Sequence, residues 1–169
     1  MILKHRLLLV DENPYVADIL LQTFKKEFNV TVATSGQEAA RLLIQGGQFD
    51  CVLTELNLPF FSGLELTKLI RMSRLMSHTP VVVLSSASDS GTRIKCLEQG
   101  VDSFIAKPFN PLEVKAKLQA LLRRVNSSAD EVRDTPSVAR GRSENKPLGQ
   151  LKSRILSMLL RDSVVSQSA

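Results

Sequence analysis

Glu55 stands where an acidic side chain could do chemistry. It ends a short apolar run, Cys51–Thr54, and Leu56–Pro59 breaks that run before Ser62–Gly63 leads into a helical pattern. A buried strand that delivers one carboxylate to a loop in front of a helix is a usual way to build a site on a parallel sheet. We therefore take Glu55 as the centre of a candidate site.

Three other apolar runs are also followed by polar side chains that could take part: Asp11 and Glu12, Ser85 and Ser86, and Lys107. Because the carboxyl ends of parallel strands meet at one edge of a sheet, we expect these groups to converge with Glu55 on one cleft. Clustered carboxylates repel one another, so a cation is expected among them, and Mg²⁺ with oxygen ligands fits best. An ammonium and a hydroxyl across the cleft would suit phosphoryl oxygens.

Five apolar runs alternate with five helical patterns in the first 124 residues. Strands are predicted at residues 6–10, 30–33, 49–54, 80–85 and 102–106, and helices begin near Pro14, Gly36, Ser62, Ser88 and Leu112. The third helix is expected to run to about Met76, with Met72 among its inward residues. This alternation predicts an α/β fold, a doubly wound five-stranded parallel sheet with helices on both faces. Right-handed crossovers leave few topologies, and the flavodoxin-like order 2-1-3-4-5 is favoured because strand 30–33 is short and polar enough for an edge.

Composition excludes several classes of protein. The 169 residues, 43% of them hydrophobic, suit one domain with an extension. No apolar run reaches the ~18 residues of a membrane span, and the N-terminus does not resemble a signal peptide. Cys51 and Cys96 suit free thiols in a reducing cytoplasm. The net charge of +5 is spread along the chain and does not argue for nucleic-acid binding.

The chain after Val125 divides into two parts. Residues 126–147 are rich in Ser, Arg, Asp, Asn and Pro and predict a flexible linker. Residues 148–162 return to helical apolar spacing and predict an amphipathic helix, which is marginal alone and would bury its stripe on a partner protein, a second copy of the chain or the domain itself. A membrane surface fits less well, and a frayed tail is the plain alternative. No helix-turn-helix pattern is found, so we expect no DNA binding here.

Four motifs, LLLVDENP, TELNLPFFSG, PVVVLSSAS and DSFIAKPF, occur in this order. Together they resemble the receiver domains of two-component response regulators, over about residues 5–124. The resemblance implies the same five-stranded fold. It also implies Mg²⁺ binding by Asp11, Glu12 and the backbone carbonyl of Asn57, phosphoryl contacts by Ser85 and Lys107, and a switch formed by Ser85 and Phe104.

One departure from the family concerns the phosphoacceptor, which is an Asp in the family and is Glu55 here. Glu is one methylene longer, so its carboxylate lies roughly 1.5 Å further out. In-line attack on a phosphodonor needs close alignment, and a misplacement of that size can cost about 100-fold in rate. We therefore expect conventional phosphorylation to be lost, and Asp50 offers no substitute because it begins the strand, at the wrong end. We also expect Mg²⁺ to bind weakly or not at all, because a Glu55–Lys107 ion pair would compete with it.

Two consequences stay open for the state of this domain. The longer carboxylate could hold an active-like state without phosphorylation, or a degenerate receiver could serve as a docking platform that never switches. An inward Phe104 with Ser85 drawn toward the cleft would favour the first, and an outward Phe104 would count against it.

The sequence therefore predicts a stand-alone cytoplasmic signalling module with no enzymatic activity of its own, acting through protein contact. The family's usual contact face consists of helix 4, strand 5 and helix 5, here around Arg93, Lys95, Phe104 and Lys115. The alternative is a phosphorelay receiver still phosphorylated on Glu55 at low efficiency. A flavin-binding protein of similar fold fits poorly, because the loop after the first strand carries two acids where phosphate binding wants unhindered backbone N–H groups.

Overall fold

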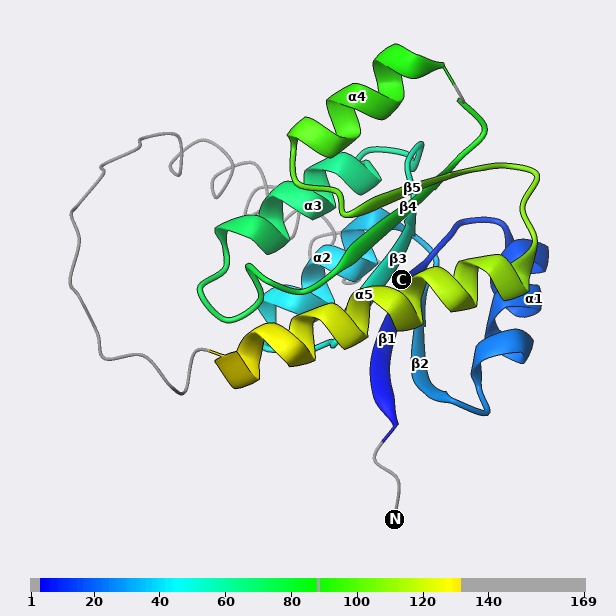
Figure 1. Ribbon diagram of the computed structural model, residues 1–169. Helices are drawn as coiled ribbons and strands as arrows, with labels where there is room; N and C mark the ends of the chain where they lie inside the picture. Colours follow the sequence, from blue (N-terminus) through cyan, green and yellow to red (C-terminus); the bar gives the residue numbers. More distant parts are fainter. Residues whose placement is uncertain (1–3, 88, 132–169) are drawn as a thin grey trace, which may run out of the picture. The chain divides into compact units, whose positions relative to one another are not determined.

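A computed structural model of the protein describes residues 4–87 and 89–131 of the chain (Figure 1). Its elements alternate as β1 His5–Val10, α1 Pro14–Phe24, β2 Phe28–Ala33, α2 Gly36–Ile44, β3 Cys51–Glu55, α3 Gly63–Met72, β4 Val81–Ser85, α4 Ser90–Glu98, β5 Ser103–Ala106 and α5 Pro111–Glu131. All strand pairs are parallel, and the order is β2-β1-β3-β4-β5. The predicted fold class and strand order are confirmed.

The sheet is buried on both faces, which explains the unbroken apolar runs of its strands. Helices α1 and α5 cover one face, where Leu20, Phe24 and Leu118 pack with alternate strand residues such as Leu7 and Leu53. Figure 1 shows α5 crossing the front of the sheet and α2 and α3 behind it. Because successive strand side chains point to opposite faces, the residues between those of the first core face the second layer of helices.

Helix α3 is shorter than predicted. The sequence pattern suggested a helix to about Met76, but α3 ends at Met72 and its cap, Ser73, is extended. Met72, predicted to point inward, is 36% exposed, whereas Thr67 is fully buried. Helical spacing missed Thr67 because its hydroxyl is polar, and that hydroxyl is satisfied by donating to the carbonyl of Gly63 at 2.8 Å.

Helix α5 is longer than predicted. It runs to Glu131, so residues 126–131, which were assigned to a linker, are helical. The hydroxyl of Ser127 donates to the carbonyl of Arg123 at 2.9 Å, a local bond that helical backbone geometry allows. Residues 132–147 of the predicted linker and the predicted helix 148–162 lie outside the described residues. None of the described helices is long and apolar enough to cross a bilayer.

Candidate functional site

Glu55 ends β3 with its carboxylate almost fully engaged inside the protein. The residue is 7% exposed. Its Oε1 accepts the backbone N–H of Asn57 at 3.0 Å, and its Oε2 forms a close ion pair with Nζ of Lys107. The hydroxyl of Thr54 donates to the Glu55 backbone carbonyl at 2.9 Å. Strand β3 therefore delivers a carboxylate whose two oxygens both have partners.

Lys107 bridges Glu55 to a second buried acid. Its Nζ lies 3.1 Å from Oδ2 of Asp11, which is 2% exposed, while Oδ1 of Asp11 accepts the N–H of Asn13 at 2.8 Å. The backbone N–H of Lys107 donates to the carbonyl of Ser85 at 2.8 Å, and its peptide bond to Pro108 is cis. Burial alone would lower the pKa of Lys107, but its contacts with Glu55 and Asp11 outweigh that cost and raise the pKa. The ammonium therefore stays charged between two carboxylates.

The start of α3 is seated directly against the backbone of Glu55. A Cβ added at Gly63 would lie 2.3 Å from the carbonyl oxygen of Glu55, so only glycine permits this approach. The N–H of Gly63 donates to the carbonyl of Leu56 at 3.0 Å. Ser62 caps the helix in a capping box with Glu65. These contacts at the start of α3 therefore hold the end of β3 in place.

The loop between β3 and α3 holds an exposed aromatic residue that the sequence pattern did not single out. Phe60 has a positive φ of 61° and is 83% exposed, and the N–H of Phe61 donates to the carbonyl of Pro59 at 2.7 Å. A bulky residue in this region of backbone space is strained. Phe61 anchors the loop, because it is buried and its carbonyl lies so close to Gly36 that a Cβ there would be 1.8 Å away.

The predicted site residues do not all meet. The structure brings Asp11, Glu55 and Lys107 together, but Glu12 is exposed. Ser85 is fully buried, and its hydroxyl accepts the N–H of Ala87 at 3.1 Å.

Phe104 lies on β5 and is 6% exposed, so it is turned inward. It cannot offer the contact surface predicted for it. Lys115, also assigned to that surface, instead forms an ion pair with Glu27 at 2.7 Å. The neighbouring helix α4 exposes two large apolar side chains, Ile94 at 54% and Leu97 at 46%. Exposed apolar side chains on these elements therefore include those of α4 and Leu112 of α5, which is 61% exposed.

The comparison with known families decides what this fold is. The model of the response regulator receiver domain matches residues 7–119. The chain belongs to the response regulator receiver family. It is therefore a receiver domain of two-component signalling, and the resemblance of its four motifs is confirmed at the level of the family.

Receiver domains of known structure share this architecture. The receiver domain of a Francisella response regulator has a TM-score of 0.66 and 27% identity, and covers 72% of this chain and 99% of its own. The receiver domain of a sensor histidine kinase from Pseudomonas aeruginosa, solved with a magnesium ion in its active-site cleft, has a TM-score of 0.64 and 26% identity, and covers 71% of this chain and 98% of its own.

A curated relative extends further than this chain. The transcriptional regulatory protein SrrA of Staphylococcus aureus is 31% identical over 130 residues, which are 76% of this chain and 52% of SrrA. The chain thus spans about half the length of the curated relatives it matches.

The acidic side chains at the centre of this cleft, Asp11 and Glu55, already have partners within the protein for their carboxylate oxygens. Among the described residues, no group of three His, Cys, Asp or Glu side chains could hold a metal ion. Asp11 and Glu55 each give one oxygen to a backbone N–H and the other to Lys107. The ammonium supplies the positive charge that clustered carboxylates require, so it competes with a divalent cation for the same oxygens.

Proposed function

We propose that this receiver domain acts in signal transduction through protein contact and without phosphorylation of its acceptor position. One observation carries the proposal. Glu55 stands at the phosphoacceptor position that the motifs imply, and both of its carboxylate oxygens are already bound, one to Lys107 and one to the N–H of Asn57. An acceptor that is held by its neighbours is poorly placed to attack a phosphodonor.

The chemistry of attack explains why this arrangement disfavours phosphorylation. The attacking oxygen must approach phosphorus in line, and the transferring group needs positive charge around it. Here Lys107 is engaged by Glu55 and Asp11, so the attacking oxygen and the neutralising ammonium are bound to each other. Separating them inside a largely buried site costs free energy before any phosphodonor is bound.

Three further statements accompany this proposal. We expect Mg²⁺ to bind weakly or not at all, because Lys107 competes for the oxygens of Asp11 and Glu55. We expect no catalytic turnover by the domain. We also propose a cytoplasmic location, which is supported by two buried cysteines, Cys51 and Cys96, that form no disulfide.

The two states left open by the sequence differ in what the switch residues do. The burial of Phe104 meets one condition for an active-like state. The described contact of the Ser85 hydroxyl is with the N–H of Ala87 and not with Glu55 or Lys107, so the second condition, Ser85 drawn toward the cleft, is not met. We therefore favour the docking platform, in which Glu55 seals the cleft instead of imitating a phosphoryl group.

The partner is proposed to be a protein that binds α4. Ile94 and Leu97 expose apolar surface there, and Arg93 and Lys95 are exposed beside them. This mixture suits a partner with apolar and acidic side chains. A second copy of the chain and a contact through residues 148–162 are the other candidates, and we expect no DNA binding by these 169 residues.

Nuclear magnetic resonance tests whether the domain responds to a phosphodonor. Spectra of the isotope-labelled protein are recorded before and after addition of acetyl phosphate and Mg²⁺. We expect the amide signals of Ser85, Phe104 and Lys107 to stay in place in the wild type. Shifts in these signals that disappear when the acetyl phosphate is consumed would support the alternative, a receiver phosphorylated at low efficiency, and would contradict this proposal.

Capture of partners tests the contact face separately. A pair of substitutions, Ile94→Asp and Leu97→Asp, should abolish binding to a protein captured by the wild type, and the binding should not depend on acetyl phosphate. The matched control is Ile19→Asp, which alters an equally exposed isoleucine on α1. Equal loss with the control would place the contact elsewhere, and sedimentation of the purified protein would show whether a second copy is the partner.

A further inference from the structure

The amino edge of the sheet carries a second site, at the opposite ends of the strands from Glu55. A pocket of about 350 Å³ opens there between the start of β1, the segment before β3, the loop between α3 and β4, and α5. Its volume is near the lower end of the roughly 300–1,000 Å³ that small-molecule sites occupy. The residues that line this pocket do not include Asp11, Glu55 or Lys107 of the cleft, so a role for the pocket does not depend on the proposed function.

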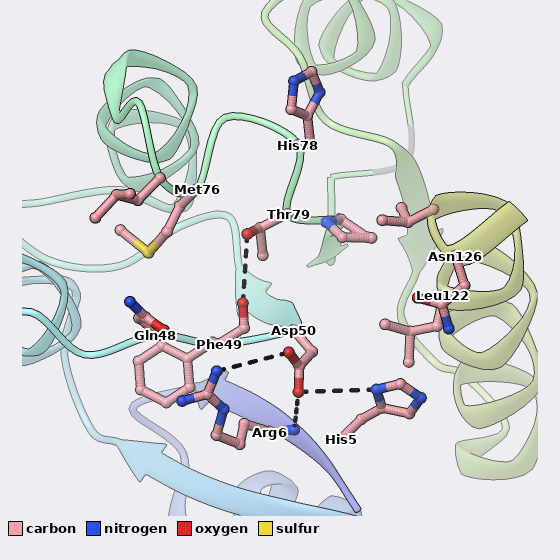
Figure 2. A pocket seen from close by; sticks show the side chains of 13 residues that line it. His5, Arg6, Gln48, Phe49, Asp50, Met76, His78, Thr79, Leu122 and Asn126 are labelled. Atoms are coloured by element: carbon pink, nitrogen blue, oxygen red, sulfur yellow. Dashed lines mark hydrogen bonds and ion pairs between the residues drawn. The ribbon is translucent and has the colours of Figure 1, made fainter. Parts of the chain in front are cut away.

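Apolar side chains form one part of this pocket. Figure 2 shows Phe49 and Met76 on one side and Leu122 of α5 on the other, with Asp50 between them. At its rim, Leu75 is 83% and Val125 37% exposed, although both are large apolar side chains. A ligand with an apolar body would remove this surface from water, which is the main source of affinity for small molecules.

The polar part of the pocket is built around Asp50. Its Oδ2 accepts the backbone N–H of Arg6 at 2.7 Å, and the N–H of Asp50 donates to the carbonyl of Arg6 at 2.8 Å. This exchange fixes the carboxylate at the edge of β1. The guanidinium of Arg6 and Nδ1 of His5 each lie 3.8 Å from a carboxylate oxygen of Asp50 (Figure 2).

A separation of 3.8 Å gives electrostatic attraction without a hydrogen bond. The side-chain N–H donors of Arg6 and His5 therefore keep their capacity for another acceptor, and both side chains are nearly half exposed. Asp50 holds these donors at the pocket, and its negative charge offsets that of the Arg6 guanidinium. Donors beside an apolar wall suit a small molecule that combines an anionic oxygen group with an apolar body.

The wall formed by the loop between α3 and β4 is held in place before any ligand binds. Arg71 donates from its guanidinium to the carbonyls of Ser77 at 3.0 Å and Thr79 at 2.7 Å, and forms an ion pair with Asp102 at 2.6 Å. The Thr79 hydroxyl also donates to the carbonyl of Phe49 at 3.4 Å. A pocket whose walls are already ordered loses less entropy when it binds.

We propose that this pocket binds a small organic carboxylate with an aromatic or branched apolar body, with the carboxylate on Arg6 and His5 and the body against Phe49 and Leu122. The probe is phenylbutyrate, titrated into the isotope-labelled full chain. We expect saturable shifts of the amides of Asp50, Thr79 and Asn126, with a dissociation constant in the low millimolar range for a ligand of this size.

Two analogues separate the parts of the ligand. Phenylbutanol keeps the body and lacks the charge, and acetate keeps the charge and lacks the body. Each should bind at least about ten-fold more weakly than phenylbutyrate. Binding of phenylbutanol as tight as that of phenylbutyrate would overturn the assignment of an anionic ligand, and the absence of saturable shifts with all three probes would overturn the site.

Substitutions test the residues assigned to the ligand. Arg6→Gln should raise the dissociation constant of phenylbutyrate about ten-fold, because it removes a charged donor. The matched control Arg123→Gln removes the same charge from an exposed position of α5 that does not line the pocket, and should leave the dissociation constant unchanged. Asn126→Trp, at an exposed lining position, should fill the mouth and abolish binding without a cost to folding. Unchanged binding in both Arg6→Gln and Asn126→Trp would contradict the proposal.

Discussion

At the carboxyl edge of the sheet, Glu55 is 7% exposed and its Oε2 lies directly on the ammonium of Lys107. At the amino edge, the side chain of Asp50 is more than a third exposed, and the guanidinium of Arg6 and the imidazole of His5 stay 3.8 Å away. Both strands β1 and β3 contribute to each edge. The same kind of charge arrangement is thus closed at one edge and open at the other.

The two edges differ because burial changes how closely an acidic residue on a parallel sheet must be paired. A buried carboxylate must be paired closely, since an unpaired charge in the interior is costly. Close pairing leaves it little capacity for a ligand. A carboxylate near water tolerates longer separations, so its cationic neighbours keep donors for another molecule. The edge that the resemblance assigns to phosphoryl contacts is therefore the closely paired one here.

The largest effect is expected from removing the ammonium at the sealed edge. Lys107→Met leaves Asp11 and Glu55 buried side by side without a cation, and should lower the free energy of unfolding by about 3 kcal/mol. Urea unfolding measures this. Lys117→Met is the control, because Lys117 pairs with Glu113 on the exposed face of α5 and should matter by less than about 0.5 kcal/mol.

The same variant sharpens the account of metal binding. With Lys107 gone, millimolar Mg²⁺ should recover part of the lost stability, because the carboxylates then need another cation. The wild type should gain no stability from the same addition. Tight Mg²⁺ binding by the wild type, well below millimolar, would show that the ammonium does not compete.

The next largest effect is expected where the start of α3 packs against the backbone of Glu55. Gly63→Ala would push a Cβ against the Glu55 carbonyl, 2.3 Å away, and should destabilise the fold by about 2 kcal/mol. Gly91→Ala is the control, because the added Cβ meets only the flexible side chain of Asp89 at 3.3 Å and alanine favours the helix. Thermal unfolding should separate the two, and equal Tm values would mean that the β3–α3 junction yields easily.

A smaller effect is expected from ionisation of the thiol of Cys51, which lies on β3, the strand that runs between the two edges. Burial, with a contribution from the charge of Asp50, raises the pKa of Cys51 from 9.0 to about 12. In the unfolded chain this thiol ionises near its ordinary pKa, whereas in the folded chain it keeps its proton. The folded state thus binds the proton more tightly between these pH values, and stability falls as the pH rises through that window.

Unfolding at several alkaline pH values measures this dependence. The loss should be about 1 kcal/mol per pH unit in the wild type beyond that of Cys51→Ala, because Lys107 titrates in both proteins and its contribution cancels. Parallel curves for the two proteins would show that the thiol of Cys51 ionises with the same ease in both states.

The smallest effect is expected at the open edge. Asp50→Asn keeps an oxygen for the N–H of Arg6 and loses only long, exposed ion pairs, so the free energy of unfolding should change by less than about 1 kcal/mol. Glu55→Gln is its counterpart at the sealed edge and should cost clearly more. Equal losses of unfolding free energy in Asp50→Asn and Glu55→Gln would show that the carboxylates at the two edges are not paired to different extents.

The carboxyl edge could largely be predicted from the sequence, because strands that end in polar residues meet at one edge in a parallel sheet. This logic assigned Asp11, Glu55 and Lys107 to one cleft. It could not tell Asp11 from Glu12, since the two acids are adjacent and only the structure decides which points inward.

The amino edge was missed for a simple reason. Asp50 was set aside as lying at the wrong end of its strand, although the same logic applied to strand starts would have paired it with Arg6 on the neighbouring strand. The support from Arg71 could not be found this way, because its partners lie in loops 6 to 31 residues away. The length of α5 was also missed, since Asn126 and Ser127 are exposed and the sequence of residues 126–131 carries no apolar stripe.

The central claim is that Glu55 is sealed against phosphoryl transfer, and the mass of the intact protein tests it most directly. The wild type and Glu55→Asp are incubated with acetyl phosphate and Mg²⁺ under the same conditions. We expect that the wild type gains no phosphoryl group, while Glu55→Asp, with a shorter side chain that reaches less far toward Lys107, acquires one. A stoichiometric acyl phosphate on Glu55 of the wild type would contradict it.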